Sequence, residues 1–592
     1  MVGLVLALCV QKPEEVTTQT LLYLVLSSIR CFFVLQSVTT VTFLCLSCYK
    51  PKDIYYCKPK RIIMRNKTIS LIMCIVLLSV MFSGCIGQQA EEAKVEVLQE
   101  LNIALGMGIG GLDPHGSLSG DARIIWACIY ETLVYLDEKM EIQPRLATSW
   151  EVSEDGKVWT FKLREGVKFH DGTPFNAEAV KFTFERLIKN KPFAVGVEIQ
   201  NIEVVDDYTV KFHLKEPFVP FLSELTRTRC SIISPTAVEG EDFKPIGTGP
   251  FVFEEWVKEE KIVLKRNDDY WGAAPPLSRV TFKIIPDAHT RVMALEAGEV
   301  DIIGIGLGQI PPEAVQRLKD NPQIQLKSRV PAHNTVWLAM NQDNEFLQDL
   351  RVRKAIIYAI DAESIVEHVI EGTGVVAVAP WSPAMIFGVK PGLQLPGYDP
   401  EKSKALLAEA GWTDTDGDGV LDKDGKPFKI TLIVHNIPPW RAVAEAVQAQ
   451  LSDVGIALEI VELERGAYFK VLREKDFDMI GISGIGLPTN DPYMHISFFY
   501  HSRYDFKVGE EAPNPSLINN PVLDDLIEKT VSTVDPEERK EIYHRIQEII
   551  VDEAVGVYLY HSGIFVALQE NVAGFKIPGG YWNLCLRGVY LT

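Results

Sequence analysis

Apolar and polar residues alternate in a series of short segments beyond residue 100. The apolar positions recur with a period of two and include many β-branched and aromatic side chains, a pattern typical of half-buried β-strands. We therefore predict strands at residues 101–105, 158–163, 208–214, 261–266 and 280–285.

Other segments place apolar residues three and four positions apart, which predicts amphipathic helices. We expect these helices at residues 177–188, 291–300, 351–360, 401–411, 441–455 and 537–554. Because strands and helices are interspersed, their order favours α/β lobes built on mixed sheets. No repeat of roughly 20 to 50 residues occurs, so the sequence does not indicate a solenoid or a propeller.

Length and composition agree with a globular protein of several domains. At roughly 100 to 200 residues per domain, the 592 residues predict about three to five structural units. Hydrophobic residues make up 47% and charged residues 23% of the chain, values close to the globular average that argue against disorder or a coiled coil. The net charge of −20 repels phosphate backbones, so nucleic acid is not an expected partner.

The chain contains the three parts of a secretory signal. A basic MRNK at Met64 precedes an apolar run at residues 69–82, which is followed by Ser83, Gly84 and Cys85. The run has 14 residues, fewer than the roughly 20 that a membrane-spanning helix needs. A cysteine directly after small residues also resembles the lipobox of prokaryotic lipoproteins, which implies that Cys85 carries a lipid.

Residues 1–63 precede this signal and contain an apolar stretch at 21–46. We expect translation to start at Met64, which makes the first 63 residues an upstream extension. The alternative is a genuine membrane helix at about 20–46, and the sequence leaves both interpretations open.

Motifs for catalysis or nucleotide binding are missing from the sequence. The string GMGIGG at 106–111 follows a predicted strand, as a dinucleotide fingerprint does. Pro114 and an expected helix start near Asp121 leave no helix N-terminus at these glycines to bind a phosphate. No P-loop, H-E-x-x-H or G-x-S-x-G motif occurs. The cysteines beyond residue 85 (Cys128, Cys230 and Cys585) are too scattered for a disulfide framework or a zinc site.

The segment DTDGDGVLDKDG at 414–425 resembles a calcium-binding loop. Positions 1, 3, 5 and 9 of the loop are the carboxylates Asp414, Asp416, Asp418 and Asp422. Gly419 at position 6 also fits, whereas position 12 is Gly425 in place of the bidentate glutamate. The alternative interpretation is a solvated acidic turn without a metal, because Asp and Gly favour turns.

Two further groups of residues have chemistry suited to a ligand. Arg227 and Arg229 would form bidentate hydrogen bonds with a carboxylate of a ligand. Alternatively, they pair with acidic residues of the protein itself. Asp491, His495 and His501 offer donors suited to nickel, zinc or copper. Alternatively, these three residues satisfy only local hydrogen bonds.

Five motifs occur in order along the body of the chain: RLATSWEVSEDGKVWTFKLREGVKFHDGTPFNAEAVKFTFERL (145–187), PIGTGPF (245–251), GEVDII (298–303), RVRKAIIYAID (351–361) and YDPEKSKALLAEAGW (398–412). Together they resemble the family 5 solute-binding proteins, the peptide and nickel class of ABC importers. The resemblance extends from about residue 101 to about residue 579 and excludes residues 1–63.

The resemblance implies an α/β protein with the two-lobed periplasmic-binding-protein fold of type II, in which a subdomain enlarges the first lobe. Two lobes that close about a hinge would bury a ligand in the cleft between them. The implied organisation is an extension at 1–63, a lipoprotein signal peptide at 64–84, a linker at 85–100, lobe I at 101–335, lobe II at 336–550 and a return to lobe I at 551–592.

The nickel branch of the family is suggested by the segments 220–235 and 486–498, which resemble its arginine segment and its G-x-P-x-D-P-H-like loop. The chain departs from that loop at Ile485 and at Tyr493, which replaces the histidine. In the peptide branch an acid of the same loop binds the amino group of the peptide, a role open to Asp491. The resemblance therefore leaves nickel chelates and short peptides open.

We expect Arg227 or Arg229 to meet a carboxylate of the ligand, and Asp491 or His495 to meet an amine or a metal. His115 and Ser117 follow the first strand at a junction that lines the cleft in this family. His115 is the histidine best placed to bind nickel, and a loop residue bonded to backbone is the alternative. Of the two ligand classes, these residues slightly favour a short peptide over a nickel chelate.

The predicted function is an extracytoplasmic, non-enzymatic lipoprotein that captures short peptides or a nickel chelate. We expect a monomer, attached to the outer face of the membrane by its lipid, whose partners are the permease and ATPase subunits of an ABC importer. We expect no required cofactor: calcium at the aspartate loop is optional, and nickel enters only as the transported ligand. The alternatives are a secreted hydrolase and a ligand-sensing receptor subunit on the same fold.

Overall fold

The computed structural model of the chain describes residues 98–592, except for 117–120, 191–194, 241, 333, 438, 484–488, 503–513, 578, 580–583 and 585. Nearer the start of the chain it describes only the backbone of a few strands. The chain divides into two compact units, Met1–Glu96 and Val97–Thr592.

The first unit contains an antiparallel sheet whose strands are β1 (Leu4–Ala7), β2 (Tyr23–Leu26), β3 (Cys31–Ser37), β4 (Thr40–Tyr49) and β5 (Tyr56–Met64). These strands correct the alternative of a membrane helix at 20–46, because β2, β3 and most of β4 occupy the described residues of that range. In the part of the chain that the structure describes, no helix is long and apolar enough to cross a membrane. The rest of the predicted signal at 64–84, and Cys85, lie outside the described residues.

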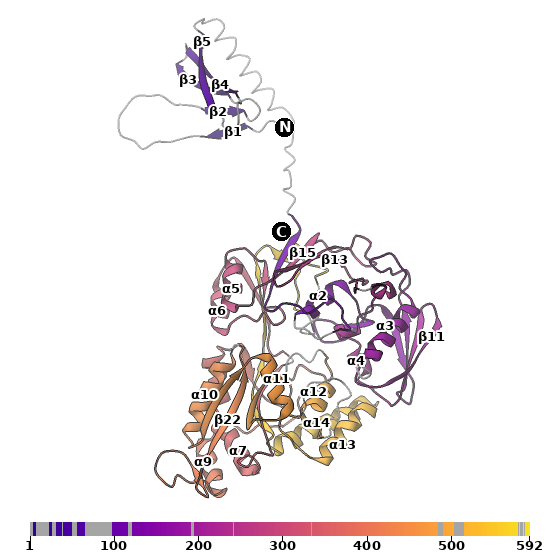
Figure 1. Cartoon of the computed structure of the whole chain (residues 1–592), viewed down its shortest axis with the longest axis vertical. Helices are drawn as coiled ribbons and strands as arrows, with labels where there is room; N and C mark the ends of the chain where they lie inside the picture. Colours follow the sequence, from indigo (N-terminus) through magenta and orange to yellow (C-terminus); the bar gives the residue numbers. More distant parts are fainter. Residues whose placement is uncertain are drawn as a thin grey trace. The chain divides into compact units, whose positions relative to one another are not determined.

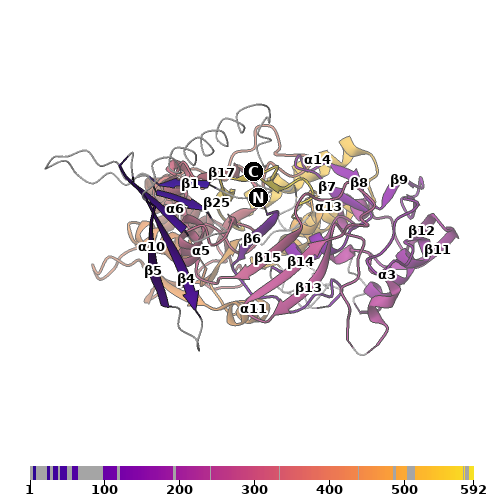
Figure 2. The ribbon, with the colours of Figure 1, turned by 90° about the horizontal axis from the view of Figure 1, so that it is seen from above.

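A seven-stranded sheet forms the centre of the first lobe in the second unit (Figures 1 and 2). In spatial order its strands are β13 (Phe251–Val257), β14 (Lys261–Arg266), β15 (Arg279–Ile284), β6 (Glu100–Leu105), β16 (Ile302–Ile303), β26 (Ile564–Gln569) and β17 (Ile324–Arg329). β6 is parallel to both of its neighbours, and the other pairs are antiparallel. The result is the mixed sheet predicted from the order of the elements.

Side chains of β6 alternate between the two faces of this sheet. Leu101, Ile103 and Leu105 enter the hydrophobic core that contains the helix α2, whereas Ala104 enters a separate core on the other face. The helices that cover the sheet are α2 (Ala122–Ile129) on the first face, and α5 (Ala288–Glu296) and α6 (Pro312–Asp320) on the second. Both faces of the sheet are therefore buried.

A second, four-stranded antiparallel sheet forms the subdomain of the first lobe. Its strands are β11 (Ile199–Asp206), β12 (Thr209–Leu214), β10 (Val158–Leu163) and β9 (Ala147–Val152). The shorter elements around it are the hairpin β7 (Val134–Leu136) and β8 (Ile142–Pro144), α4 (Phe221–Glu224), and the 3₁₀ turns η1 (Thr228–Cys230) and η2 (Pro235–Val238). Helix α3 (Ala177–Asn190) packs on β11 and β12, where Phe184 meets the edge of Phe212 with ring centroids 4.9 Å apart.

The second lobe has a six-stranded sheet with strands β19 (Gly374–Val376), β25 (Gly556–Ser562), β18 (Thr335–Met340), β24 (Met479–Ser483), β22 (Lys429–His435) and β23 (Ala457–Leu463). All six residues of β18 are buried. Leu338 enters the core on one face and Trp337 the core on the other. Strands covered on both faces are continuously apolar.

Helices cover both faces of the second sheet. On one face lie α7 (Leu350–Ala359), α8 (Ala362–Ser364), the π-helical turn η3 (Ile365–Val369), α9 (Pro400–Glu409) and α10 (Trp440–Ser452). On the other lie α11 (Arg465–Glu474), α12 (Tyr493–Tyr500), α13 (Pro521–Ser532) and α14 (Pro536–Asp552). A short hairpin, β20 (Asp422–Lys423) with β21 (Lys426–Pro427), follows α9, and β27 (Val572–Ala573) pairs with β28 (Tyr590–Leu591) near the C-terminus.

The predicted elements agree with the structure. All five predicted strands and all six predicted helices are present, with ends that differ by only a few residues. Local capping explains several helix starts: the side chains of Asp349, Asp399 and Asp535 accept hydrogen bonds from first-turn amides. Pro400 and Pro536 occupy the first helical positions, where a missing N–H costs nothing.

The chain crosses between the two lobes twice. β17 leads to β18 through residues 330–334, and β25 leads to β26 through Gly563. The two crossings are hydrogen-bonded to each other, because Ala332 N donates to Ser562 O at 2.7 Å and Ser562 N donates to Asn334 O at 2.9 Å. The return to lobe I therefore follows Gly563 rather than residue 551, because β25 pairs with β18 in the second sheet.

His561 lies beside these crossings and is fully buried. The amide of Val378 donates to its Nε2 atom at 3.2 Å, so Nδ1 carries the proton and donates to the hydroxyl of Thr335 at 3.0 Å. A second proton would sit on Nε2 and would point at the N–H of Val378, which is itself a donor. Burial accordingly lowers the pKa of His561 to about 4.

This burial predicts a loss of stability in acid. The unfolded chain takes up a proton on His561 near pH 6.5, whereas the folded protein does so only near pH 4, so its contribution is lost as the pH falls between these values. At about 1.4 kcal/mol per pKa unit, the change approaches about 3 kcal/mol. Urea unfolding at pH 7 and pH 4.5 should show a smaller loss in His561→Asn than in the wild type. His289→Asn, at an exposed site, is the control, and equal losses in all three proteins would contradict the prediction.

Candidate functional site

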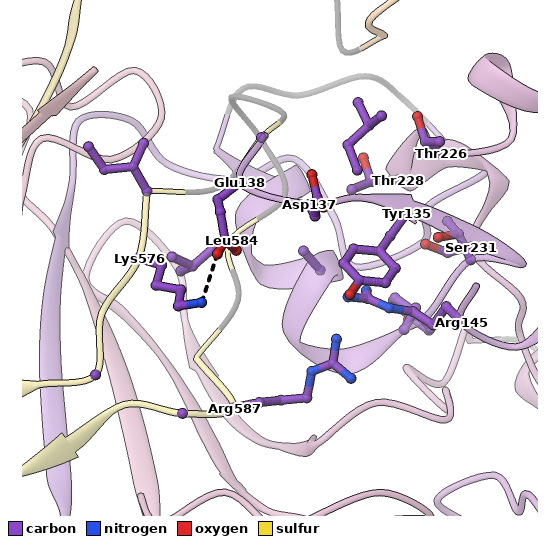
Figure 3. Close-up of a pocket in the computed structure, with 18 residues that line it drawn as sticks. Tyr135, Asp137, Glu138, Arg145, Thr226, Thr228, Ser231, Lys576, Leu584 and Arg587 are labelled. Atoms are coloured by element: carbon purple, nitrogen blue, oxygen red, sulfur yellow. Dashed lines mark hydrogen bonds and ion pairs between the residues drawn. The ribbon is translucent and has the colours of Figure 1, made fainter. Parts of the chain in front are cut away.

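A cavity of about 360 Å³ lies in the first lobe beside the end of α2 (Figure 3). Four segments that are far apart in the sequence form the described part of its wall: α2 with the strand that follows, the β7–β8 hairpin, the stretch around η1, and a segment near the C-terminus. The main polar residues of this wall are Thr132, Tyr135, Asp137, Glu138, Arg145, Thr226, Thr228, Ser231, Lys576 and Arg587. A volume of this size is typical of sites for small molecules.

Arg227 lies at the N-terminal end of η1 and Arg229 lies on it. Their neighbours Thr226, Thr228 and Ser231 line the cavity, whereas the two arginines are not part of its described wall. Arg227 is buried, and its Nη1 atom donates to Glu224 Oε2 at 2.6 Å and contacts Met494 Sδ of the second lobe at 3.2 Å. Its Nε atom is buried without a hydrogen-bond partner among the described residues. Arg227 therefore pairs with an acid of the protein, which was the alternative expected from the sequence.

Arg229 differs from Arg227 in its electrostatic surroundings. It is also buried, but no described carboxylate forms an ion pair with it. Burial, followed by the neighbouring cations Arg227 and Arg123, lowers the pKa of Arg229 to about 9, so its guanidinium remains charged at pH 7. A buried cation among cations is costly unless an anion joins it.

Asp491 is neutralised within the second lobe. Arg539 Nη1 lies 2.7 Å from its Oδ2 atom, and Oδ1 accepts hydrogen bonds from the Tyr543 hydroxyl at 2.7 Å and the Tyr493 amide at 2.9 Å. Asp491 and Arg539 are both buried. The expected role of Asp491 in binding an amine or a metal is therefore corrected, because both carboxylate oxygens already have protein partners.

Tyr493 and His495 follow on α12 and serve packing. The Tyr493 ring meets the edge of Phe218 in the first lobe at a centroid distance of 5.3 Å, and burial raises the pKa of its hydroxyl. His495 lies among aromatic rings, including Phe499 at 4.8 Å, and burial lowers its pKa to about 3. The neutral His495 packs against Phe499 and Tyr500 of the second-lobe core, and it does not line the described wall of the cavity. Its Nε2 atom is buried without a hydrogen-bond partner among the described residues, and the expected binding of an amine or a metal by His495 remains a prediction.

His115 has both ring nitrogens engaged. Arg186 Nη1 donates to its Nδ1 atom at 2.8 Å, so Nε2 carries the proton and donates to the backbone oxygen of Ser231 at 3.2 Å. Burial and then the charge of Arg186 lower its pKa to about 4. This arrangement corrects the prediction of a nickel ligand in favour of its alternative. His115 instead holds Ser231, which lines the cavity, and Ser117 lies outside the described residues.

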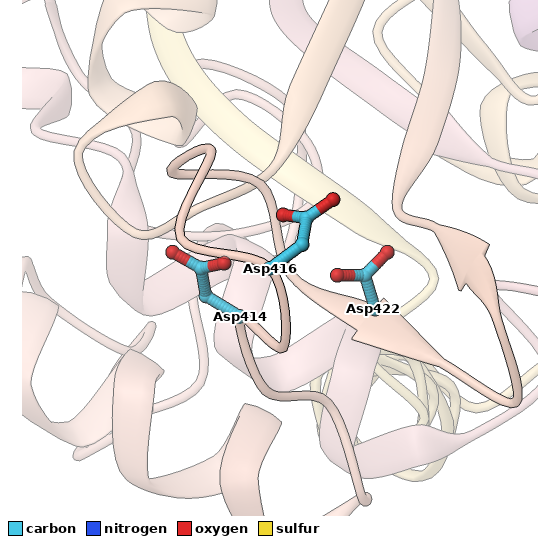
Figure 4. Close-up of side chains that lie close together, drawn as sticks. All are labelled: Asp414, Asp416 and Asp422. Carbon is cyan, nitrogen blue, oxygen red and sulfur yellow. The ribbon is translucent and has the colours of Figure 1, made fainter.

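The aspartate loop gathers part of its predicted set (Figure 4). Ligand atoms of Asp414, Asp416 and Asp422 lie within 4.8 Å of one another. Asp418 is not part of this group, and its carboxylate accepts a hydrogen bond from the Val420 amide at 2.8 Å. Asp414 likewise accepts from backbone amides of the loop. Calcium binding by this loop remains a prediction.

Sequence patterns did not reveal several important residues. Asn490 lies in the predicted loop at 486–498, where no pattern distinguishes it from its neighbours. Its side chain nevertheless forms hydrogen bonds from the second lobe to the first. Its Nδ2 atom donates to Met140 O at 2.9 Å, and its Oδ1 accepts from the Ser223 hydroxyl at 2.7 Å. Arg145 and Arg587 both line the cavity although they are far apart in the sequence. Only the three-dimensional fold brings such residues together.

Comparison with known proteins gives a consistent picture. Residues 141–506 match the model of the bacterial extracellular solute-binding proteins, family 5. The chain is 31% identical to the nickel-binding periplasmic protein of Escherichia coli K12 over 80% of this chain and 91% of that protein. It is 32% identical to the dipeptide-binding protein of the same organism over 74% of this chain and 84% of the relative.

The structure of NikA from Brucella suis in complex with Fe(III)-EDTA is similar to this one, with a TM-score of 0.76 and 30% sequence identity. The match covers 83% of this chain and all of the NikA chain. The two lobes thus have the type II periplasmic-binding-protein fold that the sequence motifs implied. With the family model and the full-length relatives in agreement, the chain belongs to the bacterial extracellular solute-binding proteins of family 5.

Proposed function

We propose that this protein captures a small carboxylate-bearing solute, a short peptide or a nickel chelate, and delivers it to the permease and ATPase subunits of an ABC importer. The names of the nickel-binding and dipeptide-binding relatives support these two ligand classes. Family 5 consists of binding proteins rather than enzymes, which removes the hydrolase alternative. A receptor subunit on the same fold remains the rival, and it predicts no permease or ATPase genes beside this one.

The observation that carries the proposal is the buried cation of Arg229. Charged groups inside proteins are normally paired, and removing an ion from water costs several kcal/mol when it has no partner. Arg229 lies between Thr228 and Cys230 on η1, next to Arg227 and Arg123, and forms no ion pair with a described carboxylate. A ligand carboxylate would supply the missing negative charge through a bidentate hydrogen bond.

The interlobe contacts support capture by closure. Asn490 bonds to Ser223 and Met140, Tyr493 packs on Phe218, and all of these contacts join the second lobe to the first. They lie next to Arg227, which itself touches Met494. A ligand that touches both lobes beside these contacts shifts the protein towards the closed state only if it binds the closed state more tightly than the open state.

Between the two ligand classes, the histidines favour a ligand that brings its own metal donors or has no metal. Both nitrogens of His115 have protein partners. The Nδ1 atom of His501 lies 3.7 Å from Asp524 Oδ1, and its Nε2 atom lies 3.4 Å from Glu528 Oε1. A bare nickel ion requires protein imidazole or carboxylate donors. His115 and His501 are otherwise engaged, and His495, whose Nε2 atom has no described hydrogen-bond partner, does not line the described wall of the cavity. We therefore place a short peptide first and a complete nickel chelate second.

Arg229→Met should abolish most of the affinity for ligand. Removal of a charge-assisted pair costs on the order of 2 to 5 kcal/mol, which corresponds to roughly 30-fold to several thousand-fold in the dissociation constant. Without ligand the variant should be at least as stable as the wild type, because the change removes a buried cation that lacks a described acid. Calorimetry with the ligand identified by native mass spectrometry, and thermal unfolding of the ligand-free protein, measure the two effects.

Two further variants sharpen this test. Asp491→Asn should lower stability, because it leaves Arg539 as a buried charge without its acid. Arg279→Met changes an arginine at an exposed position and should alter neither property. Wild-type affinity in Arg229→Met would show that the ligand carboxylate binds elsewhere.

The membrane attachment is a separate part of the proposal. We infer that the chain is cleaved before Cys85 and that lipid is added to its sulfur, because Ser83 and Gly84 suit the small-residue site of a processing peptidase. Intact mass spectrometry of the native protein should give a chain that starts at Cys85 with an added acylated group. Cys85→Ser should release the protein from membranes. A mature N-terminus upstream of Met64 would contradict both the anchor and the expected start site.

A further inference from the structure

Two arginines line the described wall of the cavity at a distance from η1. Arg145 lies between β8 and β9, and Arg587 lies in the segment near the C-terminus. The guanidinium of Arg587 extends towards Arg145 and Tyr135, and the Arg145 guanidinium lies 4.2 Å from the centre of the Tyr135 ring (Figure 3). Hydroxyl groups of Thr226 and Thr228 line the cavity as well. This wall is rich in hydrogen-bond donors.

Both arginines are oriented by one buried acid, Glu131. Its Oε1 atom lies 4.0 Å from Arg145 Nε and 3.9 Å from Arg587 Nη1. Shorter hydrogen bonds hold the carboxylate itself, from Tyr270 at 2.8 Å, Trp271 at 2.6 Å and Thr248 at 3.0 Å. Arg587 Nη1 also donates to the Tyr270 hydroxyl at 3.0 Å, the same hydroxyl that donates to Glu131. Glu131 and its partners therefore help to orient both guanidinium groups.

The acids on the same wall are engaged by other groups. The Asp137 carboxylate accepts hydrogen bonds from the amides of Lys139 and Glu141, both at 2.9 Å, and from Gln143 at 3.1 Å. Glu138 pairs with Lys576 at 2.8 Å. An amine of a ligand would have to compete with these partners, whereas a carboxylate would meet the guanidinium groups of Arg145 and Arg587. The Thr226 hydroxyl is not a free donor, because it donates to the backbone oxygen of Ser223 at 2.7 Å. The chemistry of the wall thus favours an anion over a cation.

We propose that Arg145 and Arg587 form a second anion subsite, so that this protein selects ligands with two acidic groups. The inference rests on the proposed function, in which the first carboxylate binds near Arg229, and it narrows the ligand to a dicarboxylate. An acidic side chain of a peptide and a carboxylate of a metal chelator share this chemistry. Arginine suits the role because its planar fork matches a carboxylate in a bidentate manner.

Two matched pools of di- to pentapeptides test the subsite, identical except that one contains Glu where the other contains Gln. Native mass spectrometry after mixing both pools with the protein reports which masses are retained. We expect the wild type to retain the Glu peptides about tenfold more than their Gln counterparts. Arg587→Gln should reduce this ratio to about one, and Arg587→Lys, which keeps the charge, should restore part of it. Arg279→Gln is the matched control and should keep the wild-type ratio.

A second arm distinguishes the source of the carboxylate. Citrate is offered with and without nickel, and retention that depends on Arg587 would support the subsite with a chelator as ligand. Equal retention of both peptide pools by wild type and Arg587→Gln would overturn the subsite and leave the proposed function intact. Retention of neither peptides nor nickel citrate by the wild type would overturn the proposed function together with the subsite. Thermal unfolding of each variant shows whether the Glu131 contacts have survived the change.

Discussion

Two adjacent crossings of the chain determine how this protein can move. The segment 330–334 and Gly563 carry the chain between the lobes, and backbone hydrogen bonds between Ala332, Ser562 and Asn334 tie the two crossings together. Two connections that lie side by side act as one hinge, because the lobes can rotate about them without disrupting either sheet. The seven-stranded and six-stranded sheets are covered on both faces and closely packed, so closure would concentrate change at the hinge and at the surfaces where the lobes meet.

The described contacts between the lobes are partly polar, and they include a hydrogen bond from Val219 N to Val531 O at 2.8 Å. Asn490 contributes two hydrogen bonds between the lobes, each worth about 1 kcal/mol net, and Tyr493 adds one aromatic contact with Phe218. Contacts of this size are comparable to the entropy lost on closure, which leaves the equilibrium sensitive to a ligand. In the proposed function, a ligand carboxylate at Arg229 would add its binding free energy next to these contacts and would shift the balance between the open and closed states.

Local sequence patterns predicted the elements well and the partners of charged residues poorly. Alternation identified β10 and β14 to the residue, because half-buried strands repeat with a period of two. β18 is buried on both faces and is apolar throughout residues 336–340, so it lacks that signal. Arg227 and Asp491 were predicted to bind a ligand, but their partners within the protein could not be predicted. Glu224 is three residues from Arg227, whereas Arg539 reaches Asp491 from another helix.

Asp491 and Arg229 show two outcomes for a buried charge. Asp491 has Arg539 and Tyr543 as partners, so its charge stabilises the second lobe and is not available to a solute. Arg229 has only cations and the shared acid Glu224 nearby, so its charge reduces stability until an anion arrives. Any small anion would relieve that cost, and charge alone therefore cannot give specificity. In the proposed site, selection among anions would have to come from the shape of the cavity and from donors on its wall such as Arg587.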